Sequence, residues 1–548
     1  MDELGTITTL IIDPQAGMRA SIRNMLSLYG MTKIDEAVSS GTAMRALRAN
    51  IYDVILCEYD LAEGQDGQQL LEDLRNNKII PLSTIFIMVT AEHSYDRVVG
   101  AAEQSPTAYL LKPFAADALL ERVMRALDRR ALFLPTYRLM EDGNPVAAIE
   151  ACIDGEVKHA NYAAEFERLR AELHILLGQA AEAEVIYRKL VESKGLAWAR
   201  LGLAKALFMQ NRCDEADSVL ETLIAENGKY LVAYDLLAKI RESVGRLDDA
   251  KHVLENAVAI SPHTVTRLRK LGEVAMEIGD VEIAEKSFQQ VVSKARYSEF
   301  RDPEDHVKLV KMLVKKGDMQ LAATVVRDLE KSFSGVKKSE ACRAFSAALI
   351  HMQAGDNERA AKELSAAAAA CREGAGLSND MKLDLAKTCL DNQLEQDAAE
   401  VMLEAMNNAS DSASMVKAMK VFEEAGRKDL AEAVATESRK QVVGLVSDGA
   451  DKAKQGDYRG AVELMTQAAV KFPDNPQVVF NAALSLLKCL ENLGWDNTMG
   501  RQARWYIDSC RRVDPTNPRL APLADLYQSV LKKYGIMPSH VTPKLPGR

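Results

Sequence analysis

An alanine that returns at a fixed interval is the feature of this sequence that most constrains its fold. The segments NRCDEA, GRLDDA and GDVEIA end at Ala216, Ala250 and Ala284, so the same position returns twice at an equal step. This step of about 34 residues fits one helix–turn–helix unit, which cannot bury its apolar face alone and must stack on its neighbours. Small residues let the two antiparallel helices of a unit approach closely, while larger apolar residues fill the faces shared between units. The sequence therefore predicts an all-α solenoid in this region.

The same alanine position can be followed in both directions along the chain. Segments of the same type place further alanines in register, at Ala148, Ala183, Ala322, Ala360, Ala398, Ala431 and Ala461. Three successive steps between positions 284 and 398 are longer and equal to one another, so these units are expected to have longer helices or loops. A final helix pair is expected over 475–514 and a capping helix over 518–534. The Pro-rich segment 536–548 is predicted to be a disordered tail.

This repeat resembles the tetratricopeptide repeat (TPR). Beside the alanines, the resemblance is carried by Leu271 and Gly272 early in a unit and by Ala257 and Pro262 late in the preceding one, and it is firmest over 198–294. It implies an all-α TPR superhelical solenoid of about ten repeats over residues 131–535. It also implies that protein ligands lie along the first helix of each unit.

Residues 1–130 have a different pattern, in which strands and helices alternate. Short runs rich in Ile, Val and Leu occupy 7–12, 54–57, 85–89 and 109–111, and a weaker one occupies 33–36. Such uninterrupted apolar runs are typical of parallel strands covered on both faces. Amphipathic stretches of helical length lie between them, at 18–28, 67–76 and 116–126. The order predicts an α/β doubly wound (βα)5 domain over 1–130, with its site at the carboxyl ends of the strands.

Polar residues stand at those predicted strand ends. Asp13 follows the first strand, Glu58 ends the third, Thr90 ends the fourth, and Lys112-Pro113 follows the fifth. This layout resembles the receiver domain of response regulators, of the chemotaxis-regulator type, over residues 5–128. The resemblance implies that Asp13 is the first of two metal-binding acids, Thr90 the switch hydroxyl and Lys112 the charge-pairing lysine. It also implies that Tyr109 is the aromatic residue that changes rotamer, and that Pro113 follows a cis peptide bond.

Two residues depart from the family pattern. Pro14 stands where the second acid is expected, and Glu58 stands where the phosphoacceptor Asp is expected. Mg²⁺ requires near-octahedral oxygen ligation, so the sequence predicts no cofactor beyond weak Mg²⁺ binding. The extra methylene of Glu58 spoils the geometry for in-line attack on phosphorus, so phosphorylation is not expected. Two interpretations stay open: Glu58 mimics the phosphorylated state, or the domain is a plain docking module.

The first helices of the repeats supply the candidate partner-binding groove. At the positions used by TPR ligands stand Trp198, Lys205, Phe208, Met209, Lys239, Glu242, Glu273, Met276, Lys311, Lys315 and Phe345. Lys205, Lys239 and Lys311 recur at the same position and predict a cationic track for an acidic or carboxylate-ended peptide. The alternative is that these lysines are ordinary solvated side chains and that Trp198 and Phe208 belong to the inter-repeat core.

Composition excludes several classes of function. The net charge of −10 without a basic block argues against nucleic-acid binding. No apolar run is long enough to span a membrane and the N-terminus MDELGTITTL lacks a signal-peptide layout, so neither membrane insertion nor secretion is expected. Eight scattered cysteines and eight histidines without ligand spacing predict neither a disulfide scaffold nor a metal site. Because no catalytic constellation is present, an enzyme is not expected.

Together these features predict a cytoplasmic bacterial adaptor of two-component signal transduction, which binds protein partners through the TPR groove. Its degenerate receiver would serve docking or control, including homodimerisation. One alternative is a conventional phosphorylatable response regulator with a TPR output. The other is an assembly scaffold whose receiver is purely structural.

Overall fold

The computed structural model describes residues 4–61, 66–77, 79–91, 106–141, 144–262, 264–297, 301–514 and 517–536. The chain divides into two compact units, Met1–Arg301 and Asp302–Arg548, and each is described by itself. Apart from Ile536, the predicted disordered tail lies outside the described residues.

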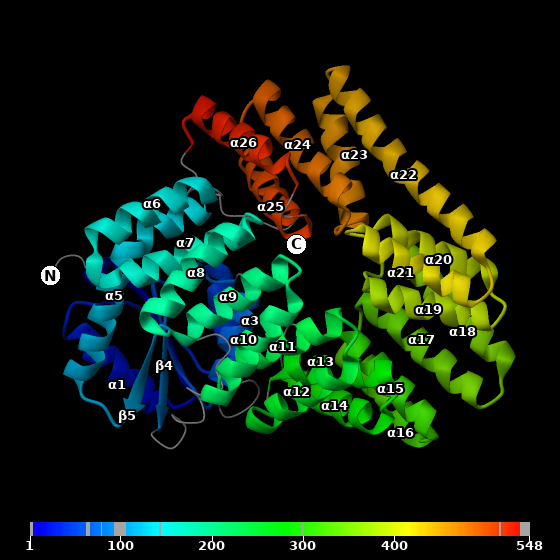
Figure 1. Ribbon diagram of the computed structural model, residues 1–548, viewed down its shortest axis with the longest axis horizontal. Helices are drawn as coiled ribbons and strands as arrows, with labels where there is room; N and C mark the ends of the chain where they lie inside the picture. Colours follow the sequence, from blue (N-terminus) through cyan, green and yellow to red (C-terminus); the bar gives the residue numbers. More distant parts are fainter. Residues whose placement is uncertain are drawn as a thin grey trace. The chain divides into compact units, whose positions relative to one another are not determined.

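The first unit opens with a parallel five-stranded sheet (Figure 1). Its strand order is β2-β1-β3-β4-β5, and the strands are β1 (Thr8–Ile12), β2 (Lys33–Ala37), β3 (Val54–Glu58), β4 (Ile85–Ala91) and β5 (Ala108–Lys112). The helices of this domain are α1 (Ala16–Ser27), α2 (Ser40–Ala49), α3 (Gly67–Asn76) and α5 (Ala116–Glu141). The predicted α/β doubly wound fold is confirmed, and the order reverses at β1 and β3, where such sheets form their sites.

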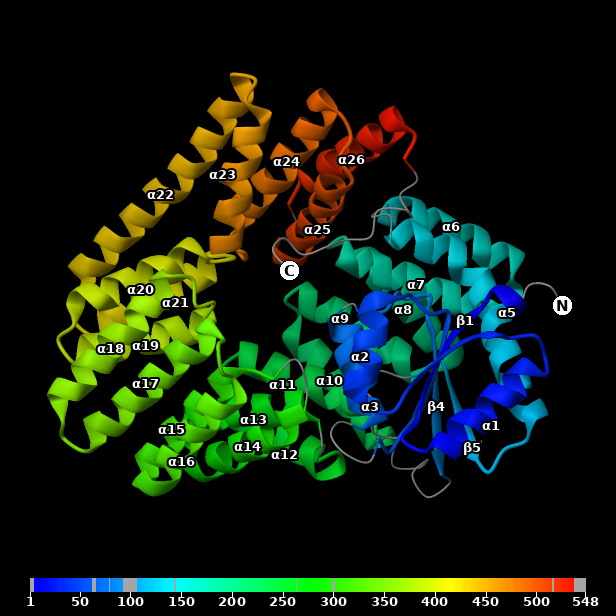
Figure 2. The ribbon, with the colours of Figure 1, turned by 180° about the vertical axis from the view of Figure 1, so that it is seen from behind.

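Apolar side chains cover both faces of this sheet, as the uninterrupted strand runs predict. One cluster joins the sheet to α2 and α3 through residues such as Met44 and Leu70. The other joins it to α1 and α5 through residues such as Ile22 and Val123. Figure 2 shows α2 and α3 on one side of β4, and α1 and α5 on the other.

Helix α5 links the sheet domain to the helical repeats without a break. It runs from Ala116 to Glu141 and therefore passes through the predicted boundary at residue 130. Beyond that boundary, Phe133 is buried in a cluster with residues of the next two helices, and its ring stacks on Phe166 with centroids 4.2 Å apart. The end of α5 is thus both the last receiver helix and part of the first repeat.

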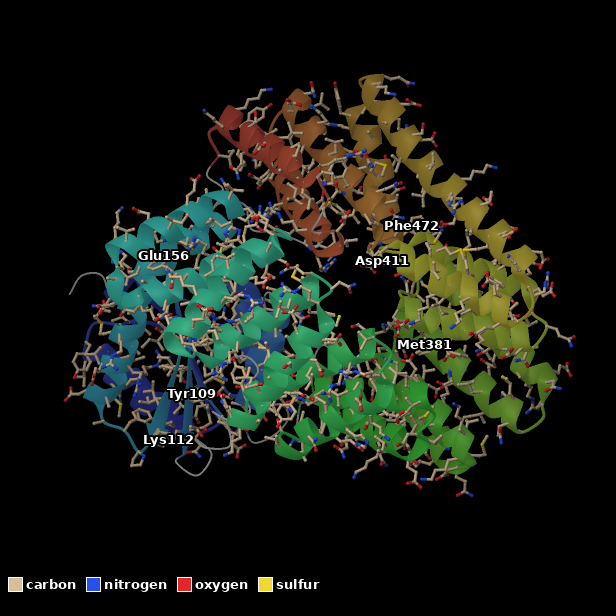
Figure 3. All side chains as sticks on the ribbon, viewed as in Figure 1. Tyr109, Lys112, Glu156, Met381, Asp411 and Phe472 are labelled. Atoms are coloured by element: carbon tan, nitrogen blue, oxygen red, sulfur yellow. The ribbon has the colours of Figure 1, made fainter. Side chains whose placement is uncertain are left out.

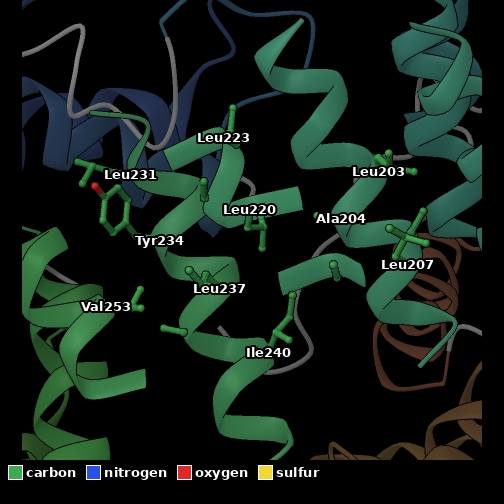
Figure 4. Close-up of a cluster of buried hydrophobic side chains, with 14 of the residues drawn as sticks. Leu203, Ala204, Leu207, Leu220, Leu223, Leu231, Tyr234, Leu237, Ile240 and Val253 are labelled. Carbon is green, nitrogen blue, oxygen red and sulfur yellow. The ribbon is translucent and has the colours of Figure 1, made fainter. Parts of the chain in front are cut away.

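The rest of the first unit is a succession of antiparallel helix pairs. Its helices are α6 (Pro145–Lys158), α7 (Ala163–Leu176), α8 (Ala180–Lys194), α9 (Ala197–Met209), α10 (Cys213–Glu226), α11 (Leu231–Ser243), α12 (Leu247–Ile260), α13 (Val265–Ile278) and α14 (Val281–Lys294). Leucines of α9–α11 fill the space between them (Figure 4).

Close packing of small residues explains why these helices pair as the sequence predicts. Every alanine of the predicted register, from Ala148 to Ala461, is 0–1% exposed. Gly202 of α9 faces the ring of Tyr187 in α8, and a Cβ there would lie 2.3 Å from that ring. Gly272 of α13 faces Phe288 of α14 in the same way. Small residues therefore recur with the repeat period because only Ala or Gly fits at these contacts between helices.

The second unit continues the same all-α pattern. Its helices are α15 (Pro303–Lys316), α16 (Met319–Ser332), α17 (Lys337–Gln353), α18 (Asn357–Arg372), α19 (Asn379–Asp391), α20 (Glu395–Asn407), α21 (Ser412–Glu424), α22 (Lys428–Lys454), α23 (Tyr458–Lys471), α24 (Pro476–Leu493), α25 (Asn497–Val513) and α26 (Leu520–Tyr534). The last three correspond to the predicted final pair and capping helix. Loops separate the other repeats, but α22 is continuous. It therefore serves as the second helix of one repeat and as the first helix of the next.

Candidate functional site

The carboxyl ends of β1, β3 and β5 bring together an acidic pair and a lysine. Asp13 directly follows β1 and is buried, while Glu58 is the last residue of β3. The Nζ atom of Lys112, at the end of β5, lies 3.3 Å from Oδ2 of Asp13 and forms a second ion pair with Oε2 of Glu58. One ammonium group therefore pairs with two carboxylates that come from separate strands.

Both oxygens of Glu58 are held by hydrogen bonds. Besides the bond from Lys112 to Oε2, the backbone N–H groups of Tyr59 and Asp60 donate to Oε1 over 2.9 and 3.3 Å. Gly67 lies behind this turn, and a Cβ there would lie 2.4 Å from the backbone oxygen of Glu58. The carboxylate is therefore fixed in position by its own strand end.

Thr90 and Tyr109 complete the predicted receiver pocket. Thr90 is buried at the end of β4, and its register partner Leu111 directly precedes Lys112 on β5. Tyr109 pairs with Met88 in the sheet and packs, half-buried, against the cluster that contains α2 and α3. Tyr109 and Lys112 both belong to β5, and Figure 3 labels them in the receiver domain. The peptide bond between Lys112 and Pro113 is cis, as the resemblance implies.

The charge of Lys112 is stabilised in this pocket. Burial opposes the charge, but the hydrogen bond and charge of Glu58, together with Asp13, outweigh burial and raise the pKa of Lys112 above its ordinary value. Next to Glu58, burial raises the pKa of the Cys57 thiol well above its ordinary value, so this cysteine stays protonated and inert.

In this structure other groups engage the carboxylates of the pocket. Pro14 supplies no carboxylate, and the oxygens of Asp13 and Glu58 are directed at an ammonium group and at backbone donors rather than at a shared position for a cation. Within the described ranges, no group of three or more His, Cys, Asp or Glu side chains could hold a metal ion. Lys112 contacts both acids of the pocket.

In the first unit, some of the predicted groove residues are exposed to solvent and others are partly buried. Lys205 and Lys239 are exposed, and Met209 is 43% exposed. Lys239 lies over the ring of Phe208, with its Nζ 5.9 Å from the ring centroid. Trp198 packs against the inter-repeat core.

The acidic groove residues of this unit are less accessible than the lysines. Glu242 is partly buried and its Oε1 is 2.6 Å from Nζ of Lys270 on the next first helix. Glu273 and Met276 are partly buried. The part of the predicted groove on α9 and α11 is therefore the more cationic part.

In the second unit, two predictions need correction. Phe345 is 1% exposed and lies in the core, so the prediction that it lines the groove is wrong. Helix α17 has 17 residues, longer than most first helices, and position counting from shorter repeats does not transfer to it. Lys311 is ion-paired with Asp384 of α19, so it is not a free cation of a track that continues from Lys205 and Lys239. Lys315 is exposed.

A cavity in the second unit was not predicted from the sequence. It measures about 640 Å³ and lies between α22, α23, α24 and α26. Its lining includes the apolar residues Val446, Leu484 and Met465 and three lysines, Lys454, Lys488 and Lys533. The spacing of Asn481, Ser485, Lys488 and Asn492, all on one face of α24, was the signal that could have located it.

Comparison with known proteins agrees with the geometry. Residues 9–124 match the response regulator receiver domain family, and residues 175–240 match the tetratricopeptide repeat family. The chain is 31% identical over 120 residues to the chemotaxis protein CheY of Pseudomonas aeruginosa, covering 22% of this chain and 95% of that protein. It is 28% identical over 120 residues to CheY-3 of Vibrio cholerae, covering 22% and 91%.

Solved structures of TPR proteins are also similar to this chain. YrrB, described as a TPR protein with an unusual peptide-binding site, is 18% identical with a TM-score of 0.29, over 34% of this chain and 91% of that one. A TPR protein from Parabacteroides merdae is 14% identical with a TM-score of 0.31, over 49% and 97%.

The fold and the pocket thus define a receiver domain fused to helical repeats. Through its N-terminal domain the chain belongs to the response regulator receiver family, and the receiver is joined here to tetratricopeptide repeats. This is the domain composition of a signal-transduction adaptor whose repeats bind proteins. Across the described part of the chain, no helix is both long enough and apolar enough to cross a membrane.

Proposed function

We propose that this chain is a cytoplasmic bacterial adaptor of a two-component pathway, in which Glu58 supplies a permanent negative charge at the phosphoacceptor position. The observation that carries the proposal is the fixed carboxylate of Glu58, which accepts bonds from Lys112 and from two backbone N–H groups. A conventional receiver has an Asp carboxylate here, and phosphorylation adds negative charge farther from the strand. The longer side chain of Glu58 carries its carboxylate farther from the strand than Asp would. In this chain the charge is constant, and Lys112 is engaged without a phosphoryl group.

The repeats would then hold the protein partner and the receiver would set how well it binds. The chain would act by contact, without catalysis, nucleic acid or a bound cofactor. Two other functions make different predictions. A passive docking module or assembly scaffold needs the Lys112 ion pairs only for folding, and a conventional response regulator needs a phosphoryl group on the receiver.

Substitution of Glu58 by Gln tests the permanent charge. The variant keeps the shape of the side chain but leaves Lys112 opposed by Asp13 alone. The expected result is a change of roughly 5- to 150-fold in affinity for the protein that co-purifies with the wild-type chain, the range of ordinary allosteric coupling. Affinity is measured by calorimetry, with Asp128→Asn, an exposed acid of α5, as the control that leaves it unchanged. Unaltered affinity and oligomeric state in a folded Glu58→Gln variant would favour the passive module.

The cavity of the second unit is the best candidate for the partner site within the repeats. Lys488 is 2.8 Å from Glu491, and Nζ of Lys533 donates to the backbone oxygen of Glu491 over 2.5 Å. Lys454 is 3.1 Å from Asp451, so two acids accompany the three lysines. One positive charge remains in excess beside the apolar lining residues of the cavity. We therefore propose an acidic peptide segment with an apolar side chain as the ligand of this cavity.

Charge reversal tests this site. Lys454→Glu with Lys488→Glu is expected to weaken binding of the co-purifying protein roughly tenfold, because two exposed favourable pairs become repulsive. The loss should be larger at low salt, where exposed charges are least screened. Lys362→Glu, on an exposed position of α18, is the matched control. If the double variant binds like the control, the partner site belongs elsewhere, first at Lys205 and Lys239.

A further inference from the structure

One face of helix α25 carries arginines at helical spacing. Arg501, Arg504, Asp508 and Arg511 follow one another at steps of three or four residues, so their side chains share one side of the helix. The apolar residues of α25, such as Ala503, pack into the core that the helix shares with α24 and α26 (Figure 1). The arginine face is therefore separate from the face that holds α25 in the repeat array.

Asp508 is shared by two of these arginines. Nε of Arg504 lies 3.2 Å from Oδ2 of Asp508, and Nη1 of Arg511 lies 3.3 Å from Oδ1. The side chain of Arg504 is only 4% exposed, yet Nε is its one nitrogen with a hydrogen bond to any group in the described part of the chain. A guanidinium group has several more N–H donors, and donors in a mostly buried place favour an acceptor. Arg504 can therefore donate to a further anion.

Arg501 has no carboxylate of its own. Within the described ranges it makes no hydrogen bond or ion pair, and its Nε is buried without a partner. Because Asp508 already serves two guanidinium groups, the face carries more positive than negative charge. The helix dipole stabilises Arg511 in the last turn of α25, but Arg501 and Arg504 lie in the first half of the helix, where the dipole gives no such stabilisation.

The indole ring of Trp495 is fixed beside the first turns of this face. The ring packs on Gly500, where a Cβ would lie 2.5 Å from it, and Nε1 donates to Oδ1 of Asn497 over 2.8 Å. Gly500 directly precedes Arg501 and lies one turn before Arg504. The ring is thus held at the end of the face where the positive charge has no acid. Apolar surroundings strengthen the attraction between such a charge and an anion, since less water screens it.

We propose that Arg501, Arg504 and Arg511 form a binding site for a phosphate group, carried by free phosphate or by a phosphorylated side chain of another protein. Guanidinium groups match phosphate oxygens with paired N–H donors. Three arginines and one aspartate leave two positive charges on this face, and a phosphate monoester carries about −1.5 to −2 at pH 7. A carboxylate would balance only half of that charge. This site goes beyond the proposed function, which makes no use of α25.

Calorimetric titration of the full chain with inorganic phosphate tests the site. The wild type is expected to bind phosphate, and Arg501→Gln is expected to weaken binding at least roughly tenfold, because a charge-assisted hydrogen bond is lost. Arg504→Lys keeps the charge but loses the planar fork, so a similar loss is expected. Arg439→Gln removes one charge at an exposed position of α22 and should bind as the wild type does. Thermal melting shows whether each variant is folded.

Two further titrations identify the ligand. A peptide with a single phosphoserine that binds more tightly than inorganic phosphate, and loses this binding in Arg501→Gln, would assign the site to a phosphorylated protein. Equal affinity of the two would assign it to free phosphate. Acetate is expected to bind at least roughly tenfold more weakly than phosphate, because it has a single charge and fewer oxygens.

Three results would overturn the proposal. The first is a wild-type chain that binds neither inorganic phosphate nor the phosphopeptide at millimolar concentration. The second is equal phosphate affinity of the wild type and a folded Arg501→Gln variant, which would place the binding at another basic group, such as Lys112. The third is acetate that binds as tightly as phosphate, which would contradict the assignment of a doubly charged ligand.

Discussion

Replacing Lys112 by Met is expected to lower the free energy of unfolding of the receiver domain by about 3–5 kcal/mol, because two mostly buried carboxylates then lose their common cation. Asp13 and Glu58 would face each other with only backbone and neighbouring donors to hold them. The measurement is urea unfolding of the full chain, followed by hydrogen exchange in β1 and β3 so that the receiver is resolved from the repeats.

The pH dependence of this loss has a definite sign. The pKa of Lys112 is raised in the folded chain, so its contribution to stability is complete below the ordinary value of 10.5 and disappears as the pH rises through the folded value. The difference between wild type and Lys112→Met should therefore be constant between pH 7 and 9. Lys33→Met, at an exposed position of β2, should change stability by less than about 0.5 kcal/mol. A Lys112→Met variant as stable as this control would mean that the ion pairs contribute nothing.

The parts of this structure that could be predicted from the sequence are those whose constraints are local or periodic. Asp13, Glu58, Thr90 and Lys112 stand directly at strand ends, and parallel strands bring such ends to one edge of a sheet. The alanine register was equally readable, since close helix contacts tolerate only small side chains. The doubly wound fold and the helix pairing followed from these two patterns.

The parts that could not be predicted depend on contacts between distant segments. Lys311 and Asp384 are 73 residues apart, so no local pattern announces their ion pair. Phe345 was misplaced because α17 is longer than the repeats used for counting. The continuous helices α5 and α22 hide the boundaries between units, and α5 continues even through Pro135.

Restoring the two missing acids is expected to convert the receiver from inert to phosphorylatable. The wild-type chain should gain no phosphoryl group from acetyl phosphate in the presence of Mg²⁺, since Glu58 is held by three donors and Pro14 offers no carboxylate. Glu58→Asp alone should remain almost inert, because the second acid is still missing. In Glu58→Asp with Pro14→Asp, a carboxylate oxygen at position 58 can attack phosphorus while the bond to acetate breaks, giving an acyl phosphate.

Intact mass spectrometry reads the outcome directly as the addition of one phosphoryl group. The double variant is expected to be modified in a major fraction of molecules, and the control Glu58→Asn with Pro14→Asp is expected to stay unmodified because its amide is not a nucleophile. Thermal melting shows whether each variant is folded. Phosphorylation of the wild-type chain that disappears in Glu58→Gln would contradict the permanent charge and favour a conventional response regulator. If the folded double variant stays unmodified, then Lys112, already engaged by the acids, blocks the pocket more strongly than the two substitutions can reverse.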